Sequence, residues 1–252
     1  RDDLCIYILC DDSLRLPPGR DNIRRIKPCW PTRNPLGRTI WEYLMLPRLL
    51  RELDSDVLFC PGGIVNGRLP PKCKIVTVFQ NMLPFQPALH SRYPLGWARL
   101  RLWILAKILL GSIQRADHAI FISEHGRQII EGLTTTPLKS TSVIYHGLSE
   151  RFKAGDREGM DPPVVAAGTE YLAYVSIFDY YKNQVEVVRA FDLVKRSRPT
   201  REKLLLVGPD HSPYSALVRR EIRDLGLDGD VVVTGSVPYE DLPGLYAHAK
   251  LN

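Results

Sequence analysis

The sequence has few of the residues that build metal and redox sites. Its 252 residues include five cysteines and six histidines, and no two cysteines form a Cys-x-x-Cys pair. The cysteines all lie in the first third of the chain, at Cys5, Cys10, Cys29, Cys60 and Cys73. Three of them fall on or at the end of expected core strands, so we expect buried free thiols in a reducing compartment and no zinc site. No Ser/His/Asp or Cys/His nucleophile order is visible either.

The sequence also has no uninterrupted apolar run of the ~18–20 residues that a membrane span needs. Its most apolar segment, residues 92–115, is interrupted by Arg99, Arg101 and Lys107. The apolar residues that recur there at helical spacing are Trp97, Leu100, Trp103, Ile104 and Ile108. We expect this stripe to pack on a sheet, because a helix between two core strands must cover that sheet. An interfacial helix on anionic lipid is the alternative.

No signal-peptide pattern precedes the first apolar run, Leu4–Cys10, and the chain opens with arginine. We therefore expect a processed or internal fragment. Residues 1–150 contain 20 Lys and Arg against 13 Asp and Glu, a net charge of +7, whereas residues 151–252 carry 14 against 15, or −1. The first half either meets an anionic partner or presents a basic solvated face.

Short apolar strands alternate with helices in both halves. Strands are predicted at Leu4–Cys10, Val57–Cys60, Lys74–Phe79, His118–Ile122, Ser142–Tyr145, 171–176, Lys203–Val207 and Asp230–Thr234. Helices are predicted near 38–53, 93–115, 124–133, 184–197, 213–225 and 240–249. This pattern predicts an α/β protein with two Rossmann-like, doubly wound domains of parallel strands. Residues 1–150 form the first domain, 151–168 a linker and 169–252 a second, incomplete domain.

Lys182 lies where a predicted strand ends and a predicted helix is about to begin. Ligands of open α/β sheets bind beyond the carboxyl ends of the strands, and a helix start favours anions. The ammonium and the helix amides can therefore meet at one phosphate, although a solvated loop lysine is the ordinary interpretation. Gly208 and Gly235, at two further strand ends, would let the backbone approach a ligand. No Gly-x-Gly-x-x-Gly or Gly-Lys-Ser/Thr motif surrounds the lysine.

The order and spacing of several motifs resembles the family-four, or "group 1", retaining glycosyltransferases. In the second half these are Lys182-Asn183, Leu204–Gly208, Val231–Val237, and Leu242 with Leu245-Tyr246 and Ala249. In the first half Asp56–Pro61, Ala116–Glu124 and Val143–Gly147 are similar to the same family. The resemblance runs from about residue 40 to the end and implies the GT-B fold of two Rossmann-like domains.

The resemblance also implies a site. A nucleotide-sugar donor, UDP- or GDP-linked, would lie between the domains, and Lys182 would neutralise its diphosphate as the glycosidic bond breaks. The other implied donor-binding residues are Asn183, Gly208, Pro209, Thr234, Gly235, Ser236 and Val237. On the acceptor side Gln80 and Asn81 would take part in catalysis, while Pro84 and Phe85 would bind the acceptor. The family transfers sugar with retention and needs no bound metal or other cofactor.

Three departures from the family pattern stand out. The arginine expected shortly before the lysine is absent from Ile177–Tyr181, so a second cation must come from elsewhere. Gln80-Asn81 replaces His-Asp, which leaves hydrogen bonding instead of proton transfer. The Glu-x₇-Glu pair would begin after Ala249, and the amino-terminal glycine loop is not evident, which again suggests an internal fragment.

We therefore expect a cytoplasmic glycosyltransferase, peripheral at the inner membrane face, that acts in cell-surface polysaccharide synthesis on a glycan or lipid-linked acceptor. No nucleic-acid partner is expected. Two alternatives stay open: a nucleotide-sugar epimerase or hydrolase of the same fold, and a non-catalytic nucleotide-binding module. Donor sugar, nucleobase and acceptor are not determined by these residues.

Overall fold

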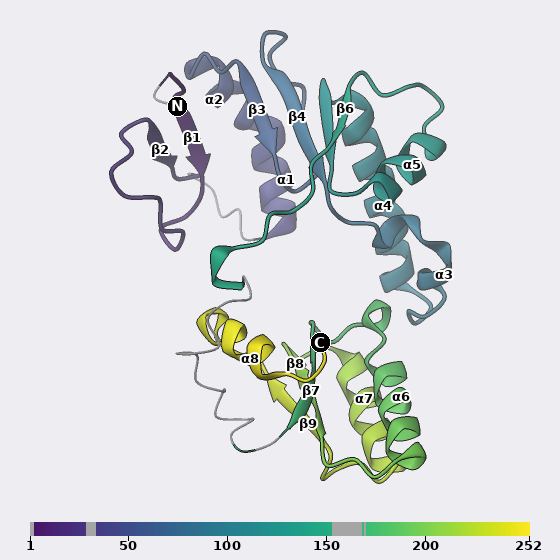
Figure 1. Cartoon of the computed structure of the whole chain (residues 1–252). Coiled ribbons are helices and arrows are strands. Elements are labelled where there is room, and N and C mark those ends of the chain that lie inside the picture. The colour runs from purple at the N-terminus through teal and green to yellow at the C-terminus, as the bar shows by residue number, and fades with distance from the viewer. Residues whose placement is uncertain (1–2, 29–33, 153–167, 169) are drawn as a thin grey trace. The chain divides into compact units, whose positions relative to one another are not determined.

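The chain divides into two compact units, residues 1–81 with 104–145, and residues 82–103 with 146–252. The computed structural model in Figure 1 describes residues 3–28, 34–152, 168 and 170–252. Residues 82–103, which the sequence assigns to the first domain, are counted with the second unit. Most of the predicted linker at 151–168 lies outside the described residues, and the predicted domain boundaries stay predictions.

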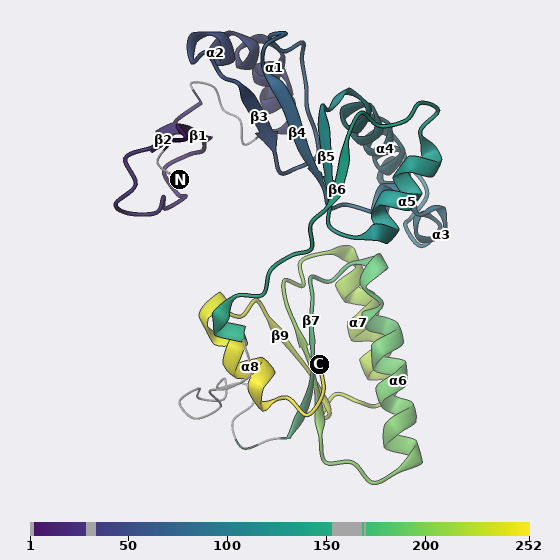
Figure 2. The same cartoon turned by 45° about the horizontal axis from the view of Figure 1, so that its top comes forward.

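The first unit carries two parallel sheets. Its strands are β1 (Ile6–Leu9), β2 (Ile23–Ile26), β3 (Val57–Cys60), β4 (Lys74–Phe79), β5 (His118–Phe121) and β6 (Thr141–Val143). β1 pairs with β2, and the other strands form one sheet in the order β3-β4-β5-β6 (Figure 2). The sequence pattern does not predict β2, because Arg24 and Arg25 occupy its centre and it neither alternates nor forms an apolar run. The other strands agree with their predicted positions.

Two helices replace the single helix predicted over residues 38–53. They are α1 (Pro35–Leu44) and α2 (Leu46–Glu52). Pro47 lies in the first turn of α2, where its missing N–H costs nothing, so a new helix begins there. The side chain of Asn34 caps α1 by accepting a hydrogen bond from the Leu36 N–H at 2.9 Å. Both helices bury apolar residues against β3 and the loop after it; the cluster is Trp41, Leu46, Leu50, Leu58, Val65 and Cys73.

Helix α4 (Trp97–Arg115) lies between β4 and β5 in sequence and follows the short helix α3 (Pro87–His90). It begins later than predicted because Pro94 and Gly96, the latter with φ of 114°, interrupt the preceding turn. Leu102, Leu109 and Ile113 are its buried apolar residues. Ser112 lies on the same face and accepts a hydrogen bond from the Val65 N–H at 3.1 Å.

The prediction that the Trp97–Ile108 stripe packs on the sheet is wrong. All five of its residues are exposed. The helix has two apolar stripes, and periodicity alone does not tell which one is buried. Within the described residues, no helix is both long enough and apolar enough to cross a membrane. Helix α5 (Glu124–Leu133), the last of this unit, is capped by the Ser123 hydroxyl, which accepts from the Gly126 N–H at 3.1 Å.

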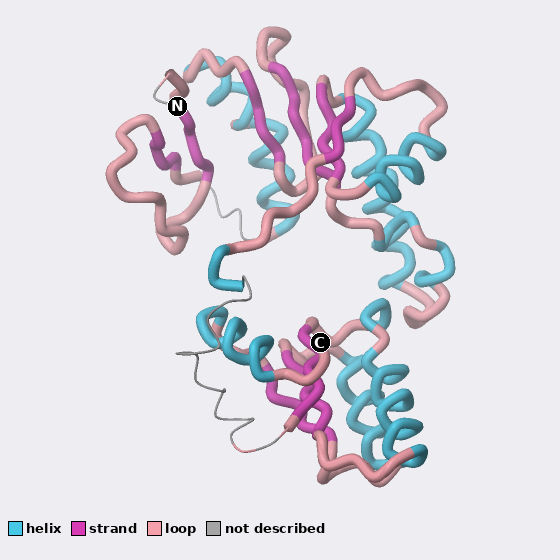
Figure 3. The backbone as a smooth tube through the Cα atoms, in the orientation of Figure 1, coloured by secondary structure: helices cyan, strands magenta, loops and turns pink. Residues whose placement is uncertain are grey.

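The second unit is a three-stranded parallel sheet with helices on both faces. Its elements are β7 (Tyr171–Val175), α6 (Gln184–Ser197), β8 (Lys203–Val207), α7 (Pro213–Asp224), β9 (Val231–Gly235) and α8 (Leu242–His248). The strand order is β7-β8-β9, with α6 and α7 side by side on one face and α8 on the other (Figure 3). Along β8, Leu204 and Leu206 pack under α6 and α7, while Leu205 and Val207 pack under α8. The predicted doubly wound α/β fold is confirmed.

The cysteines differ from one another in burial. Cys73 is buried and Cys60 is half-buried, and burial raises the pKa of the Cys60 thiol to about 11. Cys5 is exposed, so the expectation of burial is wrong for this residue. Cys10 is half-buried, and Cys29 lies outside the described residues. The four described cysteines are free thiols.

Candidate functional site at the carboxyl ends of β7, β8 and β9

The carboxyl ends of the three strands in the second unit are linked by backbone hydrogen bonds. The Ser176 N–H donates to the Val207 carbonyl at 2.8 Å, and the Gly208 N–H donates to the Gly235 carbonyl at 2.9 Å. These bonds bring together the three loops that the sequence predicted as ligand-binding. Parallel strands end at the same edge of a sheet, which is why residues so far apart in sequence meet here.

Gly208 occupies the tightest point of this edge. Its φ is 141°, and a Cβ atom placed on it would lie 2.2 Å from the Ser176 carbonyl oxygen. Only glycine fits a backbone that approaches another backbone so closely. Any side chain at position 208 is therefore excluded, because the loops after β7 and β8 come together there.

Lys182 ends a single 3₁₀ turn, Tyr180–Lys182, directly before α6. The Asp179 carboxylate caps this turn by accepting from the Tyr180 N–H at 2.7 Å, and the Tyr174 hydroxyl donates to the Lys182 carbonyl. The half-buried Lys182 ammonium lies 4.8 Å from the centre of the Tyr181 ring. Among the described residues, no carboxylate forms an ion pair with it. The site thus holds a cation whose charge is not neutralised within the described chain.

The start of α6 is less open to anions than the sequence suggests. Asn183 has φ of 58° and its side chain does not cap the helix. The Val185 N–H already donates to the Tyr214 hydroxyl at 3.2 Å. Gln184 is fully buried, and its amide nitrogen donates to the Ile177 carbonyl at 2.7 Å. The Lys182 ammonium is therefore a better candidate for holding an anion here than the first amides of α6.

A second cation reaches this edge from residues 82–103. The Arg92 guanidinium donates to the side-chain oxygen of Asn183 and lies 3.6 Å from the Glu186 carboxylate. Next to it, the Tyr93 hydroxyl donates to Asp179 at 2.7 Å. Sequence reasoning did not find these residues, because no local motif marks them and they lie far from Lys182 along the chain. The missing arginine near Lys182 was the one signal that such a residue was needed.

The remaining predicted donor residues lie on the same edge. Pro209 and Ser236 are exposed, while Thr234, Gly235 and Val237 are half-buried. The Thr234 hydroxyl donates to the Gly235 carbonyl at 3.0 Å. The structure therefore groups the donor set that the resemblance implied, and the role of each residue stays a prediction.

The predicted acceptor residues fall into both units. Gln80 and Asn81 belong to the first unit, where the exposed Gln80 amide donates to the Pro61 carbonyl at 3.0 Å. Pro84 and Phe85 belong to the second unit, in the 3₁₀ turn Leu83–Phe85, with Pro84 buried. The four residues are therefore not grouped within one unit.

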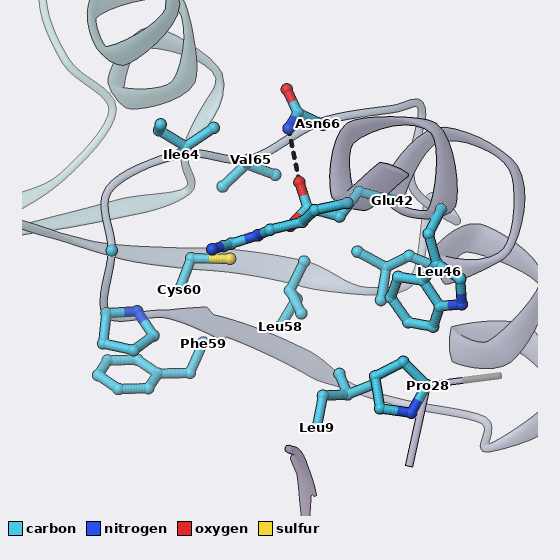
Figure 4. Close-up of a pocket in the computed structure, with 14 residues that line it drawn as sticks. Leu9, Pro28, Glu42, Leu46, Leu58, Phe59, Cys60, Ile64, Val65 and Asn66 are labelled. Carbon is cyan, nitrogen blue, oxygen red and sulfur yellow. Dashed lines mark hydrogen bonds and ion pairs between the residues drawn. The ribbon is translucent and has the colours of Figure 1, made fainter. Parts of the chain in front are cut away.

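A pocket of 340 Å³ lies in the first unit at the carboxyl end of β3 (Figure 4). Its wall includes the half-buried Cys60 and Trp41, whose buried indole N–H has no hydrogen-bond partner in the described part of the chain. The Glu42 carboxylate in the pocket accepts from Asn66 at 2.5 Å and from Arg38 at 2.7 Å. None of the predicted acceptor residues lines it. Across the described residues, no group of three or more His, Cys, Asp and Glu side chains is placed to hold a metal ion.

Family models match both halves of the chain. The model of Glycosyltransferase Family 4 matches residues 5–151, and that of Glycosyl transferases group 1 matches residues 158–252. The chain belongs to glycosyltransferase family 4. This match confirms the resemblance that the motifs suggested. A comparison with curated proteins gives no match.

Solved structures of glycosyltransferases share the fold of this family-4 chain. HepE from Anabaena, solved in complex with UDP, is 17% identical with a TM-score of 0.57 over 91% of this chain and 59% of its own. Sucrose-phosphate synthase from Thermosynechococcus elongatus is 15% identical with a TM-score of 0.60 over 94% and 60%. A glycosyltransferase from Rickettsia africae is 16% identical with a TM-score of 0.56, over 90% of this chain and 58% of its own. The chain spans about three fifths of the length of these proteins, and the likeness confirms the GT-B fold.

Proposed function

We propose that this chain is part of an enzyme that transfers a sugar from a nucleoside diphosphate sugar to a glycan or lipid-linked acceptor. The observation that carries the proposal is the Lys182 ammonium, which has no carboxylate partner among the described residues and stands at the edge where the loops after β7, β8 and β9 come together. A diphosphate leaving group gathers negative charge as the glycosidic bond breaks, and a fixed cation stabilises that charge. Arg92 supplies the second positive group that the sequence before Lys182 lacks.

The nucleotide part of the proposal draws on the similar structures. HepE was solved with UDP and with UDP-glucose, so a uridine nucleotide is the first donor to test. The finer part of the proposal follows from the family resemblance. It comprises retention of configuration, independence of metal, a cytoplasmic location and a role in cell-surface polysaccharide synthesis. Incubation of the donor without an acceptor separates this function from hydrolysis or epimerisation, in which the donor is consumed alone.

Replacement of Lys182 tests the proposed function. In the Lys182→Ala variant we expect the affinity for UDP to fall about 10- to 100-fold, because a charged hydrogen bond to phosphate is lost. Isothermal titration of UDP and GDP into the chain measures this. In the complete enzyme we expect turnover to fall by about two to three orders of magnitude.

Lys203→Ala is the matched control, because Lys203 starts β8 at the opposite edge of the same sheet. The control should bind UDP as the unchanged chain does. Equal affinities of all three proteins would contradict the role of Lys182. If the unchanged chain bound neither UDP nor GDP, the nucleotide-sugar function itself would be contradicted.

A further inference from the structure

The loop after β8 is fastened to the loop that leads from β7 to Lys182. The Phe178 N–H donates to the Pro209 carbonyl at 3.0 Å, and the Ser212 hydroxyl donates to the Phe178 carbonyl at 2.7 Å. Ser212 is the N-cap residue of α7, but its side chain makes this contact instead of capping the helix. The chain between Pro209 and Ser212 is therefore fixed against the loop that precedes Lys182.

The first turn of α7 also touches the turn that contains Lys182. The Tyr214 hydroxyl accepts from the Val185 N–H at 3.2 Å, and the centre of its ring lies 4.8 Å from that of Tyr180. Tyr214 follows His211 by only three residues. His211 therefore belongs to the same edge of the sheet as Lys182.

The carboxylate next to His211 is already engaged by a cation. Asp210 accepts a hydrogen bond from the Arg219 guanidinium of α7. This hydrogen bond, with a smaller contribution from the nearby His211, keeps the pKa of Asp210 below its usual value. The negative charge of Asp210 is thus balanced chiefly by Arg219.

The other carboxylates at the start of α6 have partners too. Asp179 accepts hydrogen bonds from the Tyr180 N–H and from the Tyr93 hydroxyl, each at 2.7 Å. Glu186 lies 3.6 Å from the Arg92 guanidinium. These contacts leave Lys182 as the cation of this edge that an anion meets without first displacing a carboxylate.

His211 is the second side chain here that is available to an anion. It is exposed, and in the described part of the chain its ring makes neither a hydrogen bond nor a salt bridge. An imidazole ordinarily changes its charge between pH 5 and pH 8. When it is protonated both of its ring nitrogens donate, and a charge-assisted hydrogen bond to phosphate is about twice as strong as a neutral one.

We infer that His211 binds the donor diphosphate together with Lys182, and that its protonation makes donor affinity depend on pH. The inference rests on the proposed function, because it concerns the same donor and the same edge. Lys182 gives a charge that stays constant over the physiological range, whereas His211 gives one that is lost as the pH rises. Donor affinity should therefore be higher at acid pH.

Calorimetric titration with UDP-glucose tests this inference. Its diphosphate is esterified at both ends and keeps a constant charge over the range studied, so any pH dependence belongs to the protein. From about pH 5.5 to about pH 8 the affinity of the unchanged chain should fall about 3- to 10-fold. His211→Gln should bind at every pH as the unchanged chain does near pH 8. His211→Lys should bind at every pH as the unchanged chain does near pH 5.5.

The other histidines of the second unit provide the controls, which are His90→Gln, His146→Gln and His248→Gln. Each should keep the pH dependence of the unchanged chain. Lys182→Ala should bind more weakly at every pH but keep the same dependence, because His211 is still present. Far-ultraviolet circular dichroism confirms that each variant is folded.

Three results would overturn the inference while leaving the proposed function intact. The first is an affinity of the unchanged chain that does not change with pH. The second is a pH dependence that persists in His211→Gln, and the third is one that disappears in a control variant instead. A chain that bound neither UDP-glucose nor GDP-mannose at any pH would contradict both the inference and the proposed function.

Discussion

At the scale of single residues, Gly208 decides whether the ligand-binding edge of the second unit can form. Its N–H donates to Gly235, while its missing side chain lets the Ser176 carbonyl lie where a Cβ atom would be. One atom at this position would separate the loops after β7 and β8. Backbone clashes of this kind do not relax by rotation of a side chain.

Replacement of Gly208 by alanine should therefore destabilise the second unit. We expect Gly208→Ala to lower the free energy of unfolding by about 3 kcal/mol, because it combines a φ of 141° with a backbone clash. Urea unfolding followed by circular dichroism measures the change. Gly229→Ala is the control: nothing lies within 4 Å of its added Cβ, and we expect an effect below about 0.5 kcal/mol. Equal stability of the two variants would contradict the clash.

At the scale of elements, a segment distant in sequence holds the turn that contains Lys182. The Tyr93 hydroxyl donates to the Asp179 carboxylate, and its ring lies 5.1 Å from that of Tyr180. The Tyr180 ring in turn lies 4.8 Å from that of Tyr214 on α7. Burial, with a further contribution from the hydrogen bond to Asp179, raises the pKa of Tyr93, so the phenol stays protonated and keeps donating. The turn is fixed between residues 91–93 and α7.

Substitutions in this segment should weaken both the turn and nucleotide binding. We expect Tyr93→Phe to lower the free energy of unfolding by about 1 kcal/mol through loss of one hydrogen bond. Arg92→Gln should reduce UDP affinity about tenfold, since a cation beside the phosphate is removed. Thermal unfolding and calorimetric titration measure these effects.

Controls for this segment are Tyr43→Phe and Arg101→Gln, which change the same groups outside the donor set. Tyr43 is exposed on α1, and Arg101 is exposed on α4. Neither substitution should alter UDP binding. If Arg92→Gln bound UDP as tightly as the Arg101→Gln control, Arg92 would have no part in the donor site.

At the scale of the whole molecule, residues far apart in the sequence are joined within the second unit by a backbone hydrogen bond and ion pairs. The Ala173 N–H donates to the Leu251 carbonyl at 2.8 Å, which places Leu251 beside β7. The Lys250 ammonium lies 2.9 Å from Glu202 and 2.8 Å from Glu170. The hydrogen bond from Lys250 lowers the pKa of Glu202 to about 2.

This ion pair makes the stability of the second unit depend on pH. A carboxyl whose pKa is lowered on folding adds stability above its unfolded pKa of about 4.3, and this stability is lost as the pH falls toward 2. We expect Glu202→Gln to melt at a lower temperature than the unchanged chain at pH 7 and at the same temperature near pH 2. Scanning calorimetry across this range checks the expectation, with the exposed Glu240→Gln as control. A difference that persisted unchanged at pH 2 would contradict the linkage.

The fold could be predicted from the sequence because its signals are local. Apolar runs such as Leu204–Val207 and helix periodicities need no knowledge of distant residues, and they identified most strands, the helices of the second unit and the order of the family motifs. Lys182, Gly208 and Gly235 were also found this way, since strand ends of parallel sheets lie at one edge. The sequence did not predict β2, because charged residues occupy the centre of this strand, which pairs along only one edge.

Tertiary structure alone decided which surfaces face inward and which distant residues meet. Helix α4 carries two apolar stripes, and folding buried Leu102, Leu109 and Ile113 while it left Trp97 and Trp103 in solvent. Arg92 and Tyr93 reached the Lys182 turn across about ninety residues of chain, a contact that no spacing in the sequence reports. Sequence by itself determined the elements and the family, because hydrophobic periodicity and motif order are properties of the chain. The position of the second cation and the exposure of the Trp97–Ile108 stripe depend on packing between segments, which exists only in the folded state.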